Sequence, residues 1–384
     1  MHEILLQATS IPFFDISLER FVFLAIAALA GGAFGAYLGA LPAFVFTGFL
    51  TFTGSLVAYL QTTVNGALMS AVPAEGISSG VGIVGTLGFG AMFGPHVSFV
   101  GGVAASTYMG KKYPELAPNG WDLHPGKVIT ESYDTAKLDI IGVGAIFGFG
   151  GWLLVLILDN AGLNLAVDAV AIAVMVMALI ARVAVGYPLI GTPAGSSILD
   201  VTPFERSEQK PVTGRDGEPI ADGGVMQMKT GVWLGHQYKW FPVAVLGVVG
   251  GVAGAYLWVF TGQFFLGYGI SALSLLFLNL GVAKIPVTHH ITLLGSVGGA
   301  LGAEIYGGEI AAAFGGEAAI AALVGGAVLG LISALLGELS ERIFYMHGGN
   351  HVDPPAVAIA ATMVIVYVLY ALNVTNAAGY LTVG

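Results

Sequence analysis

The chain has 384 residues, of which 56% are hydrophobic and only 9% are charged, whereas about a quarter of an ordinary soluble domain is charged. It contains no cysteine, which excludes disulfides, thiolate metal ligands and iron–sulfur clusters. The net charge of −10 excludes a basic surface for nucleic acid, and because acidic proteins suit a high-salt cytoplasm, it favours a halophilic archaeal source.

Uncharged apolar runs of about 18 residues or more, each long enough to cross a bilayer, predict a polytopic membrane protein. In the first half the predicted elements are 21–41, 77–93, 95–110, 138–158 and 165–185. In the second half they are 241–261, 264–282, 286–306, 318–340 and 353–372. The segment 42–75 is either an additional helix or a re-entrant excursion. The predicted fold class is therefore an all-α integral membrane protein with 10–11 transmembrane helices.

The two halves repeat one another in sequence. The matching segments are "GGAFGAYL" (31–38) with "GGVAGAYL" (250–257), "GAIFGFGG" (144–151) with "GAVLGLIS" (326–333), and "AVDAVAIA" (166–173) with "HVDPPAVAIA" (351–360). An odd number of elements, five, separates most elements from their copies, so the copies face opposite ways across the membrane. The pattern predicts two inverted-topology five-helix repeats, as in many transporters.

Three regions follow from this duplication. Residues 1–186 form the first membrane repeat, with 42–75 as an extra segment, and residues 240–384 form the second. Residues 187–239, rich in Pro, Gly and charge, form a polar linker between them. Every basic residue except Arg20 falls on the linker's side of the scheme, so the positive-inside rule makes that side cytoplasmic.

Ionisable residues at membrane depth are costly and therefore mark candidate functional positions. His96 begins the element 95–110 and Asp168 lies in the first turn of 165–185. At the matching helix starts of the second half stand His290 and the pair His351 and Asp353. The spacing predicts two related His/Asp clusters on opposite sides of the membrane, unless re-entrant hairpins bring them together at mid-membrane.

The His and Asp residues at these positions have several possible roles. An Asp before a helix caps free N–H groups and complements the helix dipole, which alone explains both aspartates. The helix starts could instead bind a small anion, or a His/Asp pair could relay protons. His347, His351 and Asp353 are also candidate ligands for a divalent metal, with help from Glu338 or Glu341.

The segments "FGPHVSFVGGVAA", "GHQYKW", "PVTHHITL" and "HVDPPA" together resemble an uncharacterised prokaryotic family of glycine-rich polytopic membrane proteins. The resemblance implies a membrane protein and no particular activity. Ammonium and urea channels are similar only in their five-plus-five inverted plan, because no motif of theirs matches this chain.

Enzyme signatures such as a phosphate-binding loop, His-Glu-x-x-His or a nucleophile elbow are absent from the sequence. We therefore expect a multi-pass cell-membrane channel or secondary transporter for a small ion or polar solute, without a cofactor. Its predicted partners are the lipid bilayer and the permeant, not nucleic acid. A homo-oligomer is a further candidate assembly. The main alternative is a non-transporting membrane scaffold or oligomer-forming structural membrane protein, and a membrane enzyme with a His/Asp metal site is a third.

Overall fold

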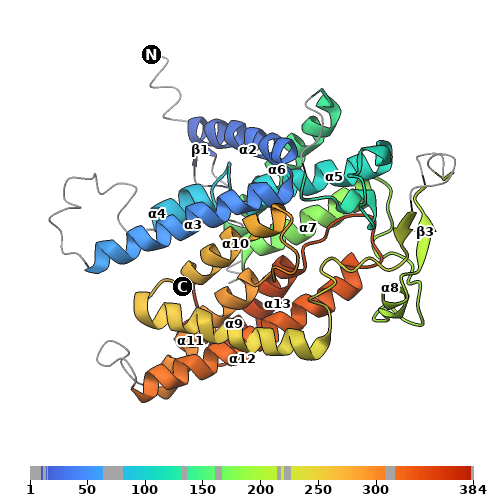
Figure 1. Ribbon diagram of the computed structural model, residues 1–384. Coiled ribbons are helices and arrows are strands. Elements are labelled where there is room, and N and C mark those ends of the chain that lie inside the picture. Colours follow the sequence, from blue (N-terminus) through green and yellow to red (C-terminus); the bar gives the residue numbers. More distant parts are fainter. Residues whose placement is uncertain are drawn as a thin grey trace, which may run out of the picture.

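The computed structural model describes residues 10–11, 14, 16–63, 81–131, 136–160, 167–213, 218–219, 226–307 and 316–381, and most of them are helical (Figure 1). The elements of the first half are β1 (Ser10–Ile11), β2 (Ile16–Ser17), α2 (Leu18–Leu38), α3 (Ala40–Thr63), α4 (Val81–Ile83), η1 (Val84–Gly88), η2 (Pro95–Phe99), α5 (Val100–Lys112), η3 (Pro114–Leu116), η4 (Pro125–Lys127), α6 (Leu138–Asn160) and α7 (Ala169–Ala184). The polar linker of residues 187–239, which we call the connection, contains α8 (Thr202–Glu205), β3 (Gln209–Pro211) and β4 (Met226–Met228). The second half has α9 (Trp240–Thr261), α10 (Leu266–Asn279), α11 (His289–Tyr306), α12 (Glu317–Ser340), η6 (Glu341–Tyr345) and α13 (Pro354–Ala371). Two short antiparallel pairs, β1 with β2 and β3 with β4, complete the described part.

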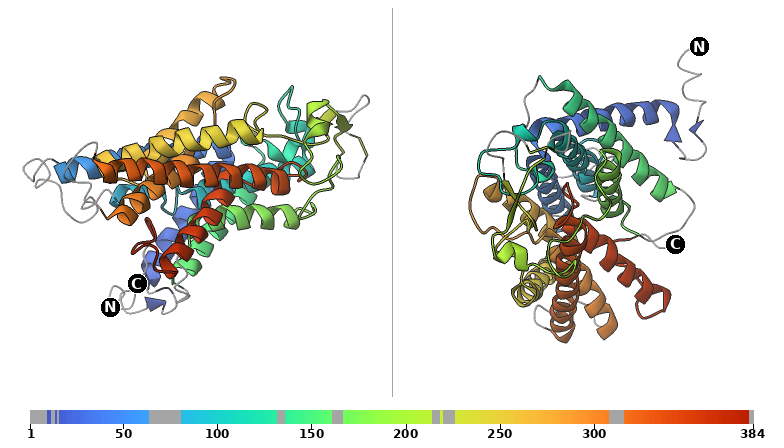
Figure 2. Two further views of the ribbon diagram at one scale, coloured as in Figure 1. Left: turned by 90° about the horizontal axis from the view of Figure 1, so that it is seen from below. Right: turned by 90° about the vertical axis from the view of Figure 1, so that its right-hand side faces the viewer.

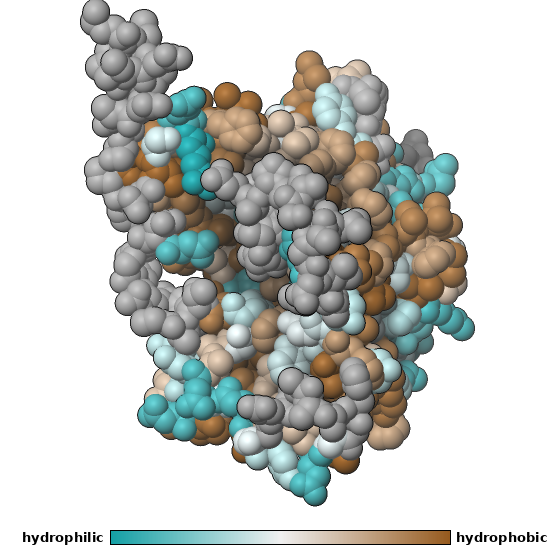
Figure 3. Space-filling view, turned by 90° about the vertical axis from the view of Figure 1, so that its left-hand side faces the viewer, coloured by the Kyte–Doolittle hydropathy of each residue, from teal (hydrophilic) through white to brown (hydrophobic). Residues whose placement is uncertain are grey.

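Within the described residues, six helices are long and apolar enough to cross a membrane: α2, α3, α6, α9, α12 with η6, and α13. Two shorter apolar helices, α7 and α10, accompany them. Large apolar side chains remain exposed on these helices, and brown, hydrophobic residues cover much of the face in Figure 3. The mostly helical architecture of a multi-pass membrane protein is thus confirmed.

The number of spanning helices is smaller than the ten or eleven predicted. The stretch 77–93 is helical in the described part only from 81 to 88, in α4 and the π-helical η1. The 13 residues of α5 are too few to span a bilayer by themselves. Residues 42–63 of the extra segment belong to α3, which begins at Ala40. It follows α2 after Gly39, whose φ of 91° turns the chain between the two helices. The rest of 42–75 lies outside the described residues.

In the first half, α2, α5 and α6 meet along glycines. A Cβ atom added to Gly32 of α2 would collide with the carbonyl oxygen of Gly144 in α6. A Cβ at Gly101 of α5 would collide with the carbonyl oxygen of Gly32. Three backbones therefore lie in direct contact at what we call the first seam, the close approach that small residues permit in membrane helices.

In the second half, α9, α11 and α12 meet in the same way at the second seam. A Cβ at Gly251 of α9 would strike the carbonyl oxygen of Gly326 in α12, and one at Gly295 of α11 would strike that of Gly251. Gly32 and Gly251 occupy the same place in "GGAFGAYL" and "GGVAGAYL", and Gly144 and Gly326 both begin their repeated segments. The sequence matches thus coincide with matching contacts.

The other helices lie between the two three-helix groups, with α2, α5 and α6 above and α9, α11 and α12 below in Figure 1. Helices α9 and α12 run side by side in the view from below, whereas α13 is inclined to them (Figure 2). Helix α3 of the first half packs along α10 of the second, where Gly48 approaches Leu273 and Gly269 approaches Phe52. Helix α7 contacts α13 in the same central layer.

Candidate functional site

The two helices α7 and α13 each begin at a capping aspartate. Asp168 Oδ1 accepts a hydrogen bond from the backbone N–H of Ala171 at 2.7 Å. Asp353 Oδ2 accepts one from the N–H of Ala356 at 2.9 Å. Both aspartates therefore act as N-caps, as the capping interpretation requires.

The second carboxylate oxygen of each aspartate has a different partner. Tyr380 donates its hydroxyl hydrogen to Asp168 Oδ2 at 2.6 Å. His351 Nε2 lies 3.4 Å from Asp353 Oδ1. His351 is completely buried, and Asp353 is only 8% exposed. The caps are thus alike, whereas their outer contacts differ.

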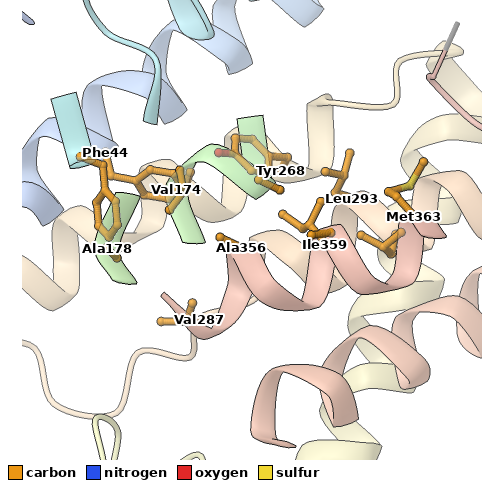
Figure 4. Close-up of a cluster of buried hydrophobic side chains, with 14 of the residues drawn as sticks. Phe44, Val174, Ala178, Tyr268, Val287, Leu293, Ala356, Ile359 and Met363 are labelled. Atoms are coloured by element: carbon orange, nitrogen blue, oxygen red, sulfur yellow. The ribbon is translucent and has the colours of Figure 1, made fainter. Parts of the chain in front are cut away.

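Both aspartates line one cavity of about 40 Å³ between the two halves, which we call the central cavity. This volume has room for roughly three water molecules. Its wall is otherwise mainly apolar and aromatic, with Trp233 of the connection and Phe265 and Tyr268 of α10 among its residues. The wall residues labelled in Figure 4 are Phe44 of α3, Val174 of α7, Tyr268 of α10, Leu293 of α11, and Ala356 and Ile359 of α13.

Apart from Trp233 and Tyr268, the polar side chains of the central cavity are carboxylate or imidazole groups. Besides Asp168 and Asp353, its wall contains His289, whose ring lies 4.8 Å from that of Phe44 and 5.5 Å from that of Tyr268, centroid to centroid. The described residues of this wall include no lysine and no arginine. The cavity therefore combines carboxylates with aromatic rings, groups that both suit a cation.

A second cavity, of about 30 Å³, adjoins the first through Trp233, which lines both. We call it the acidic cavity, because Glu338 and Glu341 line it together with His290. Glu338 is paired with Arg342 at 2.6 Å, and Glu341 accepts the backbone N–H of Trp233 at 2.9 Å. Sequence reasoning placed His290 in one cluster with Asp353, but the structure puts them on the walls of two adjoining cavities.

A family model described as "Family of unknown function (DUF7973)" matches residues 13–384. The chain belongs to this family. The expected relationship to an uncharacterised family is confirmed, and the family brings no assigned activity. No curated protein and no solved structure is significantly similar to the chain. The chemistry must therefore be argued from the residues themselves.

His96 lines neither cavity, although its neighbour Pro95 lines the central one. It belongs to the π-helical turn η2, is 2% exposed, and has an Nδ1 atom without a hydrogen-bond partner in the described part of the chain. Its carbonyl group packs against Gly151 of α6, while the carbonyl of His290 accepts a hydrogen bond from Ser333 of α12 at 3.3 Å. The two histidines are therefore placed alike against their own halves, although only His290 lines a cavity.

The three metal candidates do not assemble. His347 directs Nε2 to the carbonyl of Ile198 at 2.9 Å, whereas His351 contacts Asp353. Among the residues with a described position, no three His, Cys, Asp or Glu side chains come close enough to hold a metal ion. The candidate ligands therefore do not form a metal site within the described part of the chain, because "HGGNH" is a turn and not one helix face.

Sequence reasoning missed two residues of the site. Trp233 lies in the polar connection, yet it lines both cavities. Tyr380 lies near the C-terminus, beyond the last predicted helix, yet it holds Asp168. An indole in an otherwise polar segment was a signal for Trp233, since a large aromatic side chain generally finds a buried place; the sequence offers no comparable signal for Tyr380.

Proposed function

We propose that this protein is a channel or secondary transporter that moves a small ion or polar solute through the central cavity. The observation that carries the proposal is that Asp168 and Asp353, at matching positions of the two sequence repeats, line the same cavity. A binding site at the interface of two repeats is the usual arrangement in secondary transporters.

The proposal includes the inverted repeat. The matching seam contacts of Gly32 and Gly251 support equivalent three-helix groups in the two halves. The mutual contacts of α3 and α10 favour α3 as the counterpart of α10, in place of the stretch 77–93. Because η2 runs directly into α5, the two form one element of residues 95–112. Five apolar elements (α2, α3, η2 with α5, α6 and α7) then precede α9, and five crossings would give the two halves opposite orientations.

The proposed orientation places the connection in the cytoplasm. In Figure 1, β3 and α8 lie together at one end of the long helices. The connection contributes Arg206, Lys210 and Lys229 to that end, and clusters of basic residues beside spanning helices favour the cytoplasmic side. The acidic cavity, which is partly walled by Leu234 and Gln237 of the connection, then lies on the cytoplasmic side of the central cavity.

The charge of the central cavity favours a cation, a proton included, over an anion. Anion binding at the starts of α7 and α13 would need their free N–H groups, but the aspartates already accept hydrogen bonds there. An anion would also lie beside two carboxylates without a lysine or arginine in the described wall. Trp233 separates this cavity from Glu341 and is the side chain whose movement would connect the two.

Purified protein in proteoliposomes tests the proposal. We expect uptake of protons, followed with pyranine, or of Na⁺ or Rb⁺, to be faster than in protein-free liposomes. The uptake is measured both in dilute and in molar KCl, because the acidic composition predicts a halophilic source. Asp168→Asn and Asp353→Asn should reduce this flux at least tenfold, because Asn keeps the cap and removes the charge. Asp122→Asn, at an exposed position outside the cavities, is the matched control and should leave flux unchanged.

The scaffold alternative predicts a different result. The carboxylate oxygens of Asp168 and Asp353 already have partners within the chain, as a purely structural role would require. If no probe ion, chloride included, crosses the wild-type proteoliposomes faster than protein-free ones, the transport proposal is wrong and the aspartates only cap helices.

A further inference from the structure

A third cavity lies at the connection end of the molecule, apart from the two cavities described above. It measures about 230 Å³ and is enclosed by the loop before α6, the chain after α7, strands β3 and β4, and the turn that precedes α13. We call it the basic pocket, because Lys127, Lys210, Lys229, His124 and His347 line it and no Asp or Glu does within the described wall.

Lys127 is the most unusual of these side chains. It is 2% exposed, and its ammonium group makes a single long hydrogen bond, 3.4 Å, to the carbonyl of Met346. The ammonium nitrogen lies 4.2 Å from the centroid of the Tyr345 ring. None of the carboxylates with a described position lies within 4.0 Å of it. An ammonium has three donors, so this buried charge lacks the partners that burial normally demands.

The surroundings of Lys127 add positive charge. Burial lowers the pKa of Lys127 well below its usual value, the charges of Arg182 and Lys210 lower it further, and only the charge of Glu341 acts in the opposite direction. Lys210, exposed on β3, has no ion pair in the described structure, whereas Lys229 is already paired with Glu208 at 3.1 Å. An anion entering this pocket would therefore find two lysines in its wall that form no ion pair within 4.0 Å with a described carboxylate.

Neutral donors complete the wall. His124 Nδ1 accepts the N–H of Gly126 at 3.0 Å, which leaves the proton of the neutral ring on Nε2. The hydroxyl of Tyr187 is buried without a hydrogen-bond partner among the described residues. Such groups can donate hydrogen bonds to an anionic oxygen alongside the amines.

The pocket is built from rigid parts. A Cβ at Gly348 would collide with the Arg182 guanidinium, and one at Gly349 would press on the Tyr187 ring. Arg182 itself is bound by the Asn350 side chain at 2.6 Å and by the carbonyl of Leu189 at 2.8 Å. These contacts fix the turn 347–350 against the chain after α7, so the wall is formed before any ligand arrives.

We propose that the basic pocket binds an oxyanion of the phosphate class, either as a free small ion or as the headgroup of an anionic lipid. Lysine is a common point-charge ligand for phosphate, and an oxyanion would supply the hydrogen-bond acceptors that Lys127 lacks. The proposal is independent of transport through the central cavity.

Calorimetric titration of inorganic phosphate into the full-length protein, held in nanodiscs of neutral phosphatidylcholine at low salt, tests this assignment. We expect saturable binding that Lys127→Met and Lys210→Met each weaken at least tenfold. Lys210 is exposed on a short strand, so its variant should fold even if Lys127→Met does not. Lys284→Met removes the same charge from an exposed loop elsewhere and should change the affinity less than twofold.

A second arm separates the two sources of the ligand. In nanodiscs containing phosphatidylglycerol, a headgroup ligand should compete with phosphate and should be retained by the purified wild-type protein but not by Lys210→Met. A free oxyanion should bind equally in both kinds of nanodisc. If neither phosphate nor phosphatidylglycerol binding depends on Lys127 or Lys210, the assignment is wrong.

Discussion

The glycine seams and the central cavity are packed in opposite ways. At the seams, backbone meets backbone, and even one additional carbon atom at Gly32 or Gly251 would collide with a carbonyl group. At the centre, bulky side chains such as Phe44 and Tyr268 surround a cavity of about 40 Å³. Close packing resists rearrangement, whereas side chains around a cavity can repack. The contrast indicates two rigid three-helix groups with an adaptable region around the cavity between them.

The strongest test of this contrast is to enlarge a seam glycine. Gly32→Val and Gly251→Val should each cost about 3 kcal/mol or more, because overpacking must push two helix backbones apart. We expect a large loss of monodisperse protein and a lower unfolding temperature in detergent. Gly142→Val, on α6 with no atom within 4 Å of its added Cβ, is the control for the same substitution. Equal behaviour of the three variants would contradict rigid seams.

The second test removes hydrogen bonds that join the two halves. Arg182, at the end of α7, is fully buried and donates to the carbonyl of Phe344 at 2.5 Å and to the Asn350 side chain at 2.6 Å. Arg182→Met leaves these acceptors unpaired and should cost about 2–3 kcal/mol, seen as a lower unfolding temperature. Arg206→Met, whose side chain is 71% exposed, should cost almost nothing. A small effect at Arg182 would mean that apolar packing alone joins the halves.

The third test separates structure from charge at the central cavity. Asp353→Ala should lose about 1 kcal/mol of stability with the cap, while Asp353→Asn should keep most of that stability. Flux should fall in both variants if the carboxylate carries the permeant. Unchanged flux in Asp353→Asn, measured with the same pyranine assay, would falsify a transport role for this carboxylate.

The last test extends the comparison to the basic pocket, through an effect that appears only on acidification. Burial, together with the charges of Lys127, Lys210 and other basic groups, lowers the pKa of His124 to about 3. The unfolded chain has a histidine pKa near 6.5, so between about pH 6.5 and 3 it binds a proton that the folded chain does not. The free energy of unfolding therefore falls as the pH falls through this window, by at most about 1.4 kcal/mol per pH unit from this group.

His124→Asn should weaken this acid sensitivity, because Asn keeps an acceptor for the Gly126 N–H and does not titrate. Unfolding temperatures between pH 6.5 and 4.5 measure the difference. If the unfolding temperature of the variant falls with pH as steeply as that of the wild type, His124 does not contribute to the acid sensitivity.

The helices were predictable where an apolar run has a clear beginning. The prediction 138–158 lies within α6 at Leu138–Asn160, and Asp353, the predicted start of 353–372, is a cap in the structure. Asp168, predicted to lie in the first turn of 165–185, is also a cap, and α7 begins at Ala169. Predictions failed where local signals conflict: the stretch 77–93 is rich in glycine, and its described helical part is short and partly π-helical. The metal site failed because the spacing of His347 and His351 says nothing about where their rings point.

The meeting of Asp168 with Asp353 around one cavity could not be derived from spacing. It depends on how α7 packs against α13, which is a contact between residues nearly two hundred positions apart. The contributions of Trp233 and Tyr380 have the same origin, since each reaches the site from outside the predicted helices. Local patterns determine helix starts, while long-range packing determines which starts share a site.

The contact between α3 and α10 has a consequence for the ancestry of the chain. Gly48 approaches Leu273 while Gly269 approaches Phe52, a reciprocal pairing that has the form of the isologous interface of a two-fold dimer. On the proposed repeat, this contact once joined two separate, identical subunits. Fusion through the connection holds the copies together without demanding identity, so each could change alone. The unlike companions of the two aspartates, Tyr380 for one and His351 for the other, are what such freedom to diverge would produce.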